Sequence, residues 1–202
     1  MSIQDIQVYL PKYLSEENYR ILLKELDSFP NNIDQRMYTT SLPNNIIFQG
    51  DGYESLPFVN LMKMEDGCKY RSGIVLSNTC DMAPENRRLY SSSIIYAPIM
   101  DLQKYVEGLQ VRNIQEDIIK NHIIDIRKQA ITSMMFLPSN SKMSDSIVFL
   151  NRIMSVDNSY ISREEMNSKR LFSLSDYGFY MLLFKLSVHF SRIQEKVNRG
   201  HS

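Results

Sequence analysis

The chain has 202 residues, of which 43% are hydrophobic and 23% are charged, as in a folded chain with a sizeable core. Its 23 basic and 23 acidic residues cancel, which excludes a strongly basic protein that coats nucleic acid and leaves a local basic groove as the alternative. Two cysteines cannot form a disulfide framework, and no pair has metal-ligand spacing. We therefore expect a reducing, cytoplasmic compartment with no metal or cofactor. Since no secretory signal or long apolar stretch is present, we expect no membrane partner.

Residues 1–44 are predicted to form an N-terminal helical segment. Ser15 is suited to cap a helix, and Glu16 and Glu17 in the first turn suit the helix dipole. The apolar residues recur at helical spacing: Tyr19, Leu22, Leu23 and Leu26. This pattern predicts a packing or partner-contact surface and no chemistry.

Short apolar runs separated by turn signals follow in residues 46–99. The runs at 57–62, 73–76 and 93–99 predict strands, and a long polar loop at 78–92 separates the last two. Strands at roughly ten-residue spacing are typical of a small, strongly bent antiparallel barrel.

Residues 101–128 change to helical periodicity, and Gly108 and Asn113 indicate two helices. The runs at 130–137 and 145–150 flank a turn-rich segment, which predicts a hairpin that completes the sheet. Residues 157–202 are predicted to close the chain with a helix, for which Ser175 is the candidate N-cap.

The segment most suggestive of chemistry is residues 69–81. A buried β-branched strand ends here in five small polar residues: Ser77, Asn78, Thr79, Cys80 and Asp81. Such side chains can converge on a ligand, but they also form local turns by bonding their own backbone, and this alternative stays open. Two weaker alternatives are Cys80 as a nucleophile without a nearby histidine, and Cys80 with Asp81 as metal ligands.

Cations are concentrated around the same segment. Lys69 and Arg71 precede the strand, and Arg87 and Arg88 lie in the loop after it. If that loop folds over the sheet, the four cations would line a groove suited to a phosphodiester. The alternative is that each cation is solvated or paired with a nearby carboxylate.

The run RSGIVLSN at 71–78, followed by IIYAPI at 94–99, resembles the core of the PemK/MazF-like toxins. Gly50-Asp51 is similar to the Gly-Asp that opens the first strand of that family. The resemblance covers about residues 50–100. It implies an SH3-like barrel, usually dimeric, in a bacterial toxin or phage-defence type of system, and several members of the family cut single-stranded RNA.

The resemblance places Arg71 on the catalytic arginine of the family, with Ser77 and Asn78 on its strand-end polar pair. The family's catalytic Thr or Ser falls on Met100, which cannot donate a hydrogen bond to phosphate. The predicted catalytic residues are Arg71 and Ser77. The predicted substrate-binding residues are Lys69, Asn78, Thr79, Cys80, Asp81, Arg87 and Arg88.

The predicted fold is α+β: an SH3-like antiparallel barrel at 45–156 with a helical insertion at 101–128 and helices at both ends. The first functional hypothesis is a PemK/MazF-like protein that binds single-stranded RNA or cleaves it without a metal. The alternative is a non-catalytic protein-interaction module that uses the barrel as scaffold and the helices as interface. A separate antitoxin chain and a homodimer are the expected protein partners.

Overall fold

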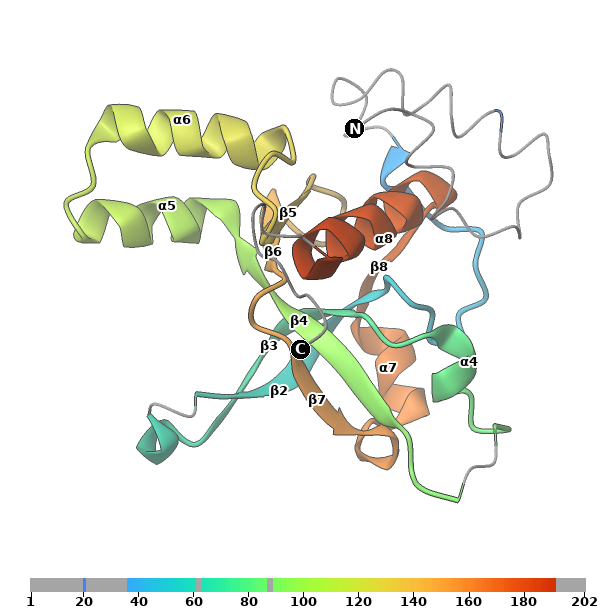
Figure 1. Ribbon diagram of the computed structural model, residues 1–202. Coiled ribbons are helices and arrows are strands. Elements are labelled where there is room, and N and C mark those ends of the chain that lie inside the picture. The colour runs from blue at the N-terminus through green and yellow to red at the C-terminus, as the bar shows by residue number, and fades with distance from the viewer. Residues whose placement is uncertain (1–19, 21–35, 61–62, 87–88, 192–202) are drawn as a thin grey trace, which may run out of the picture.

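The computed structural model describes residue 20 and residues 36–60, 63–86 and 89–191. The helix predicted near the N-terminus and the predicted binding residues Arg87 and Arg88 lie outside these ranges. The described part is an α+β fold in which one antiparallel sheet carries helices at its ends and on its faces (Figure 1).

The sheet has eight strands among the described residues. They are β1 (Tyr38–Thr39), β2 (Gly52–Val59), β3 (Cys68–Val75), β4 (Ser93–Asp101), β5 (Met134–Leu137), β6 (Ser146–Phe149), β7 (Met154–Asp157) and β8 (Arg170–Leu174). Their order is β1-β8-β2-β3-β4-β6-β5, with β7 also beside β4. No strand pair in this part of the chain joins β1 to β5. The sheet is therefore open, and the predicted closed barrel is not confirmed.

Several strand predictions are confirmed. β3 covers residues 73–75 of the run predicted at 73–76, and β4 covers the run predicted at 93–99. β5 and β6 form the predicted antiparallel hairpin. The sequence analysis did not predict β7, β8 or α7 (Arg163–Lys169). β8 is a five-residue run between two helices, and it becomes a strand because β1 and β2 pair with its two edges.

The helical insertion is confirmed as α5 (Leu102–Val111) and α6 (Glu116–Arg127). Asp101 caps α5 by accepting a hydrogen bond from the Lys104 N–H, and Asn113 adopts the left-handed conformation needed in the turn. The Tyr105 hydroxyl contacts His122 Nε2 at 2.9 Å and joins the two helices. Together α5 and α6 form an arm that projects away from the sheet (Figure 1).

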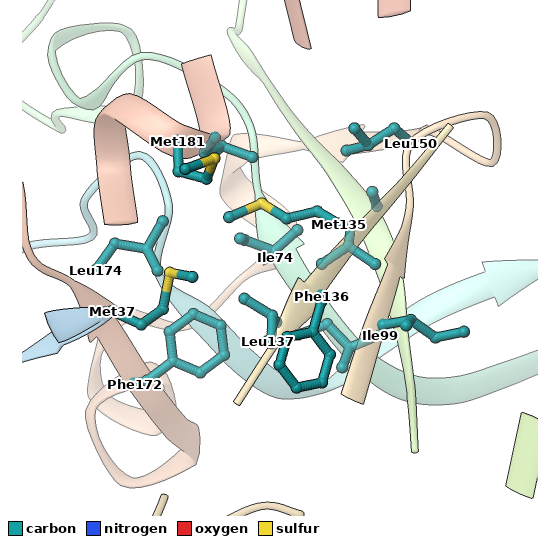
Figure 2. Packing of buried hydrophobic residues seen from close by; sticks show 14 of the residues in the cluster. Met37, Ile74, Ile99, Met135, Phe136, Leu137, Leu150, Phe172, Leu174 and Met181 are labelled. Atoms are coloured by element: carbon teal, nitrogen blue, oxygen red, sulfur yellow. The ribbon is translucent and has the colours of Figure 1, made fainter. Parts of the chain in front are cut away.

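The predicted C-terminal helix is confirmed as α8 (Asp176–Ser191), and the Ser175 hydroxyl accepts from the Gly178 N–H as an N-cap does. One apolar cluster packs α8 against the strands, with Met181 close to Met135 and Ile74 (Figure 2). A second cluster joins β2 and β4 to α7 and to α4 (Thr79–Met82) through Met82 and Met166. Two 3-10 turns, η1 (Met64–Asp66) and η2 (Asn158–Tyr160), complete the described elements.

Lys185 is a buried cation on α8. Its Nζ donates to the carbonyl oxygens of Gln129 at 2.9 Å and Ile131 at 2.5 Å, which ties α8 to the segment before β5. Burial lowers the pKa of Lys185 to about 8.

This depressed pKa predicts a pH-dependent stability. Between about pH 8 and pH 10.5 the unfolded chain binds more protons than the folded chain at Lys185, so stability rises with pH in that window. We expect the free energy of unfolding to rise by about 2 kcal/mol from about pH 7.5 to pH 9.5 in urea titrations. Lys185→Met should abolish this rise. Equal slopes in the two proteins would contradict the prediction.

Candidate functional site

The strands β3 and β4 separate after a short paired region, and a hollow lies where they diverge. Among the described residues, they pair only over Gly73–Val75 and Tyr96–Pro98. An open hollow of about 480 Å³ lies just beyond this paired region. It is lined by Arg71 and Ser72 of β3, which precede the paired residues, and by Ile99 to Asp101 of β4, which follow them. Arg71 is exposed, so its guanidinium is available to a ligand.

A bulge in β2 supplies a carboxylate to the same hollow. The pairing of β2 with β3 shifts between Tyr53 and Leu56, and Ser55 has a φ of 58°. A non-glycine residue in this left-handed region costs of the order of 1 kcal/mol, and bulges of this kind redirect side chains. Glu54, which lies in this bulge, lines the hollow with Arg71.

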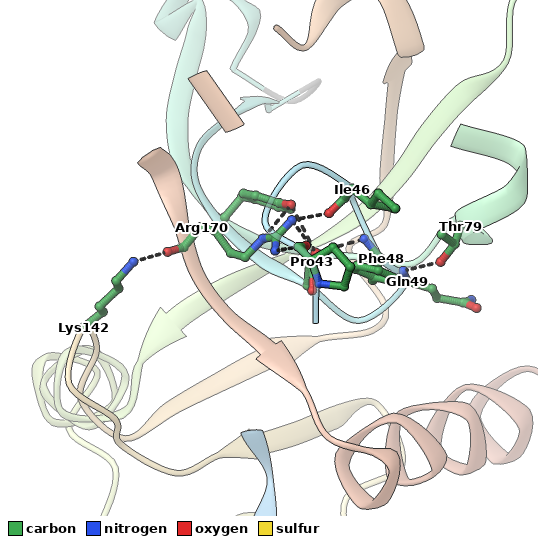
Figure 3. A network of polar contacts seen from close by, with 9 residues as sticks. Pro43, Ile46, Phe48, Gln49, Thr79, Lys142 and Arg170 are labelled. Carbon is green, nitrogen blue, oxygen red and sulfur yellow. Dashed lines mark hydrogen bonds and ion pairs between the residues drawn. The ribbon is translucent and has the colours of Figure 1, made fainter. Parts of the chain in front are cut away.

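Two lysines reach the hollow from outside β3. Lys104 comes from the first turn of α5, directly after β4, and Lys142 comes from the loop between β5 and β6. Lys142 Nζ donates to the Arg170 carbonyl oxygen at 2.7 Å, which holds it beside β8 (Figure 3). Among the lining residues, three cations therefore face two carboxylates, Glu54 and Asp101, and the local charge is positive.

A buried polar cluster around the Arg170 side chain fixes β8, the strand whose Arg170 carbonyl accepts from Lys142. Arg170 donates to the Tyr53 hydroxyl at 3.1 Å and to the carbonyl oxygens of Pro43 and Ile46, and it pairs with Asp51 at 3.4 Å (Figure 3). Burial raises the pKa of Asp51, whereas the hydrogen bond from the Phe48 N–H and the charge of Arg170 lower it. Asp51 is fully buried, so this part of the Gly50-Asp51 motif is structural.

The predicted polar residues at the end of β3 serve the local fold. Ser77 is buried, and its hydroxyl donates to the Ser93 carbonyl and accepts from the Ile95 N–H at 2.7 Å. Asn78 caps α4 by accepting from the Cys80 N–H, and Thr79 Oγ1 accepts from the Gln49 N–H at 3.0 Å. The Asn78 bond is the local turn that the sequence left open as an alternative. Ser77 and Thr79 instead bond to backbone groups far away in the chain.

The hollow that holds Arg71 does not include the predicted Ser77–Asp81 segment. Arg71 and Ser77 are six positions apart in the chain, which corresponds to about 20 Å where the chain is extended. None of residues 77–81 lines the hollow around Arg71, nor the cavity of about 360 Å³ between the loop after α4 and η2. Cys80 and Asp81 are exposed, and Lys69 pairs with Asp66 at 2.7 Å.

Met100, which the predicted resemblance aligns with a catalytic hydroxyl, lines the hollow with Arg71. Sequence reasoning missed Glu54, Lys104 and Lys142, because their proximity depends on strand order and on a bulge. The sequence offered one signal for Lys104: it lies four residues after Met100, a position that the resemblance placed in the site. Within the described ranges, no group of three or more His, Cys, Asp or Glu side chains could hold a metal ion.

No protein-family model and no curated protein sequence matches this chain. The resemblance to the PemK/MazF-like toxins therefore stays a prediction. No helix in the described part of the chain has the length and apolar character needed to span a bilayer.

Proposed function

We propose that this protein is a divergent PemK/MazF-like protein that binds single-stranded RNA in the hollow between β3 and β4. The observation that carries the proposal is the exposed Arg71 guanidinium beside Lys104 and Lys142 in one open hollow. A guanidinium binds two phosphate oxygens at once, and lysines add point charges along the backbone. Single-stranded nucleic acids are bound by positively charged grooves of this kind, and a neutral net charge does not oppose local binding.

The same hollow holds groups that would support cleavage without a metal. The Glu54 carboxylate can accept the proton of a ribose 2′-hydroxyl that attacks the phosphorus, and Arg71 can stabilise the charge of the pentavalent phosphate. The P–O5′ bond then breaks, the leaving 5′-oxygen takes a proton from water, and the other product carries a 2′,3′-cyclic phosphate. Met100 supplies no hydrogen bond where the family has a hydroxyl. We therefore propose binding as the main activity and expect any cleavage to be slow.

Arg71→Ala should weaken RNA binding at least about tenfold, because it removes a charge-assisted phosphate contact. The measurement is fluorescence anisotropy of a labelled single-stranded RNA in excess EDTA, repeated over a range of salt concentrations. The slope of log affinity against log salt should fall in magnitude by about 0.7 for each lost contact. The melting temperature should stay nearly unchanged, since Arg71 is exposed.

Lys69→Ala is the matched control. Lys69 lies two residues from Arg71 on the same strand, but it pairs with Asp66 and does not line the hollow. We expect its RNA affinity to stay within about twofold of the wild type. Equal losses in the two variants would mean that the hollow does not direct binding, and unchanged binding by Arg71→Ala would remove Arg71 from the site.

The second candidate function is self-association through the α5–α6 arm. Val111, Ile114 and Ile118 are exposed by 83%, 39% and 56% at the tip of the arm. In addition, α6 begins with Glu116 and Asp117 and ends with Arg127, so an antiparallel second copy would place opposite charges together. A dimer in light scattering, without RNA binding in the anisotropy assay, would favour this candidate.

A further inference from the structure

Two exposed tyrosines, one on the sheet and one in a 3-10 turn, are joined through their hydroxyl groups. Tyr70 lies on β3, and Tyr160 ends η2, ninety residues later in the chain. Their hydroxyl oxygens are 3.0 Å apart, and this contact is the main cause that raises the pKa of Tyr160. The rings are nevertheless open to solvent, with Tyr70 59% and Tyr160 55% exposed.

This aromatic area does not serve the core. Neither ring belongs to the two apolar clusters that hold the sheet to its helices. Tyrosines usually bury most of the ring and leave only the hydroxyl in water, whereas here the hydroxyls are joined and the rings remain exposed. An exposed aromatic pair is therefore a surface on which a ligand can bury apolar area.

The position of Tyr70 connects the pair to the hollow. Tyr70 directly precedes Arg71, and adjacent Cα atoms are about 3.8 Å apart. On the β4 side, the part of β3 that includes Tyr70 and Arg71 has no strand partner among the described residues. Consecutive side chains of a strand point to opposite faces of the sheet, so a single strand of nucleic acid that wraps over this free edge of β3 would meet the Arg71 guanidinium on one face and the Tyr70 ring on the other.

We propose that Tyr70 and Tyr160 form a stacking platform for the bases of a single-stranded RNA whose phosphates contact Arg71. This inference rests on the proposed RNA binding. Proteins that bind single strands without sequence preference combine cations for the backbone with aromatic rings on which successive bases stack. The platform supplies the second of these requirements, and it predicts little preference among bases, because every base has a stacking face.

The experiment compares Tyr70→Leu and Tyr160→Leu with Tyr70→Phe, using two probes. One probe is a labelled oligouridine, and the other is a ribose-phosphate oligomer of the same length without bases. Each Leu variant should lose about tenfold in oligouridine affinity, because a stacking contact is lost. Tyr70→Phe keeps the ring and should stay within about twofold. The salt slope should match the wild type in all three variants, since no phosphate contact changes.

The abasic probe separates stacking from every other cause. All three variants should bind it as the wild type does, at similar melting temperatures. If the wild type binds neither probe, the proposed RNA binding fails and the platform fails with it. If the wild type binds oligouridine and the Leu variants bind it equally well, the platform alone is overturned. An equal loss in Tyr70→Phe and Tyr70→Leu would also overturn it, because the hydroxyl contact would then be the cause.

Discussion

Replacing Arg170 with methionine should lower the free energy of unfolding by about 3–5 kcal/mol. The substitution leaves the Asp51 carboxylate buried without its cation, and removing one partner of a buried ion pair has a cost of this size. It also leaves the Tyr53 hydroxyl and the carbonyl oxygens of Pro43 and Ile46 without their donor. Urea titrations that follow circular dichroism measure the loss.

The neighbouring Lys169 provides the control. Lys169 pairs with Glu165 one turn earlier on α7, where the Glu165 side chain is exposed and the Lys169 side chain is partly exposed. Lys169→Met should therefore cost less than about 1 kcal/mol. Adding Asp51→Asn to Arg170→Met should recover part of the loss, because it removes the unpaired charge. An Arg170 variant as stable as the Lys169 variant would show that the buried pair does not stabilise the fold.

A single methyl group on Gly178 should destabilise the protein by about 1–3 kcal/mol. A Cβ at this position would lie 2.3 Å from the Met37 carbonyl oxygen and 3.0 Å from the Met37 sulfur. The nearer atom belongs to the backbone that leads into β1, so it cannot move aside as a flexible side chain would. The clash outweighs the better helix propensity of alanine, which is about 1 kcal/mol. Thermal and urea unfolding of Gly178→Ala measure the effect.

Gly108→Ala makes the same change with the opposite expected sign. Gly108 lies in α5, and a Cβ there would have no heavy atom within 4 Å. Without a clash only the helix propensity remains, and we expect stabilisation by up to about 1 kcal/mol. If the two variants shift stability in the same direction, close packing of α8 against Met37 would not be the reason that glycine is required at 178.

Local sequence patterns were sufficient to predict the helices and the hairpin, because these elements form between residues that are close in the chain. The hairpin of β5 and β6 follows from two apolar runs around a turn-rich segment, and α5, α6 and α8 follow from 3–4 spacing and from caps such as Ser175. The first predicted helix lies outside the residues that the structure describes. β8 was missed, because five residues between two helices carry too little periodicity.

The α+β composition, the two-helix insertion and the candidacy of Arg71 could be predicted, since each depends on residue type and short-range spacing. The surroundings of Arg71 could not be predicted, because they depend on contacts between distant parts of the chain. The separation of β3 from β4 opens the hollow, and the β2 bulge and the β5–β6 loop bring Glu54 and Lys142 to it. Tertiary contacts also pair Ser77 and Thr79 with backbone groups far away in the chain. Such placements depend on strand order and on contacts between residues far apart in the chain, which no local pattern encodes.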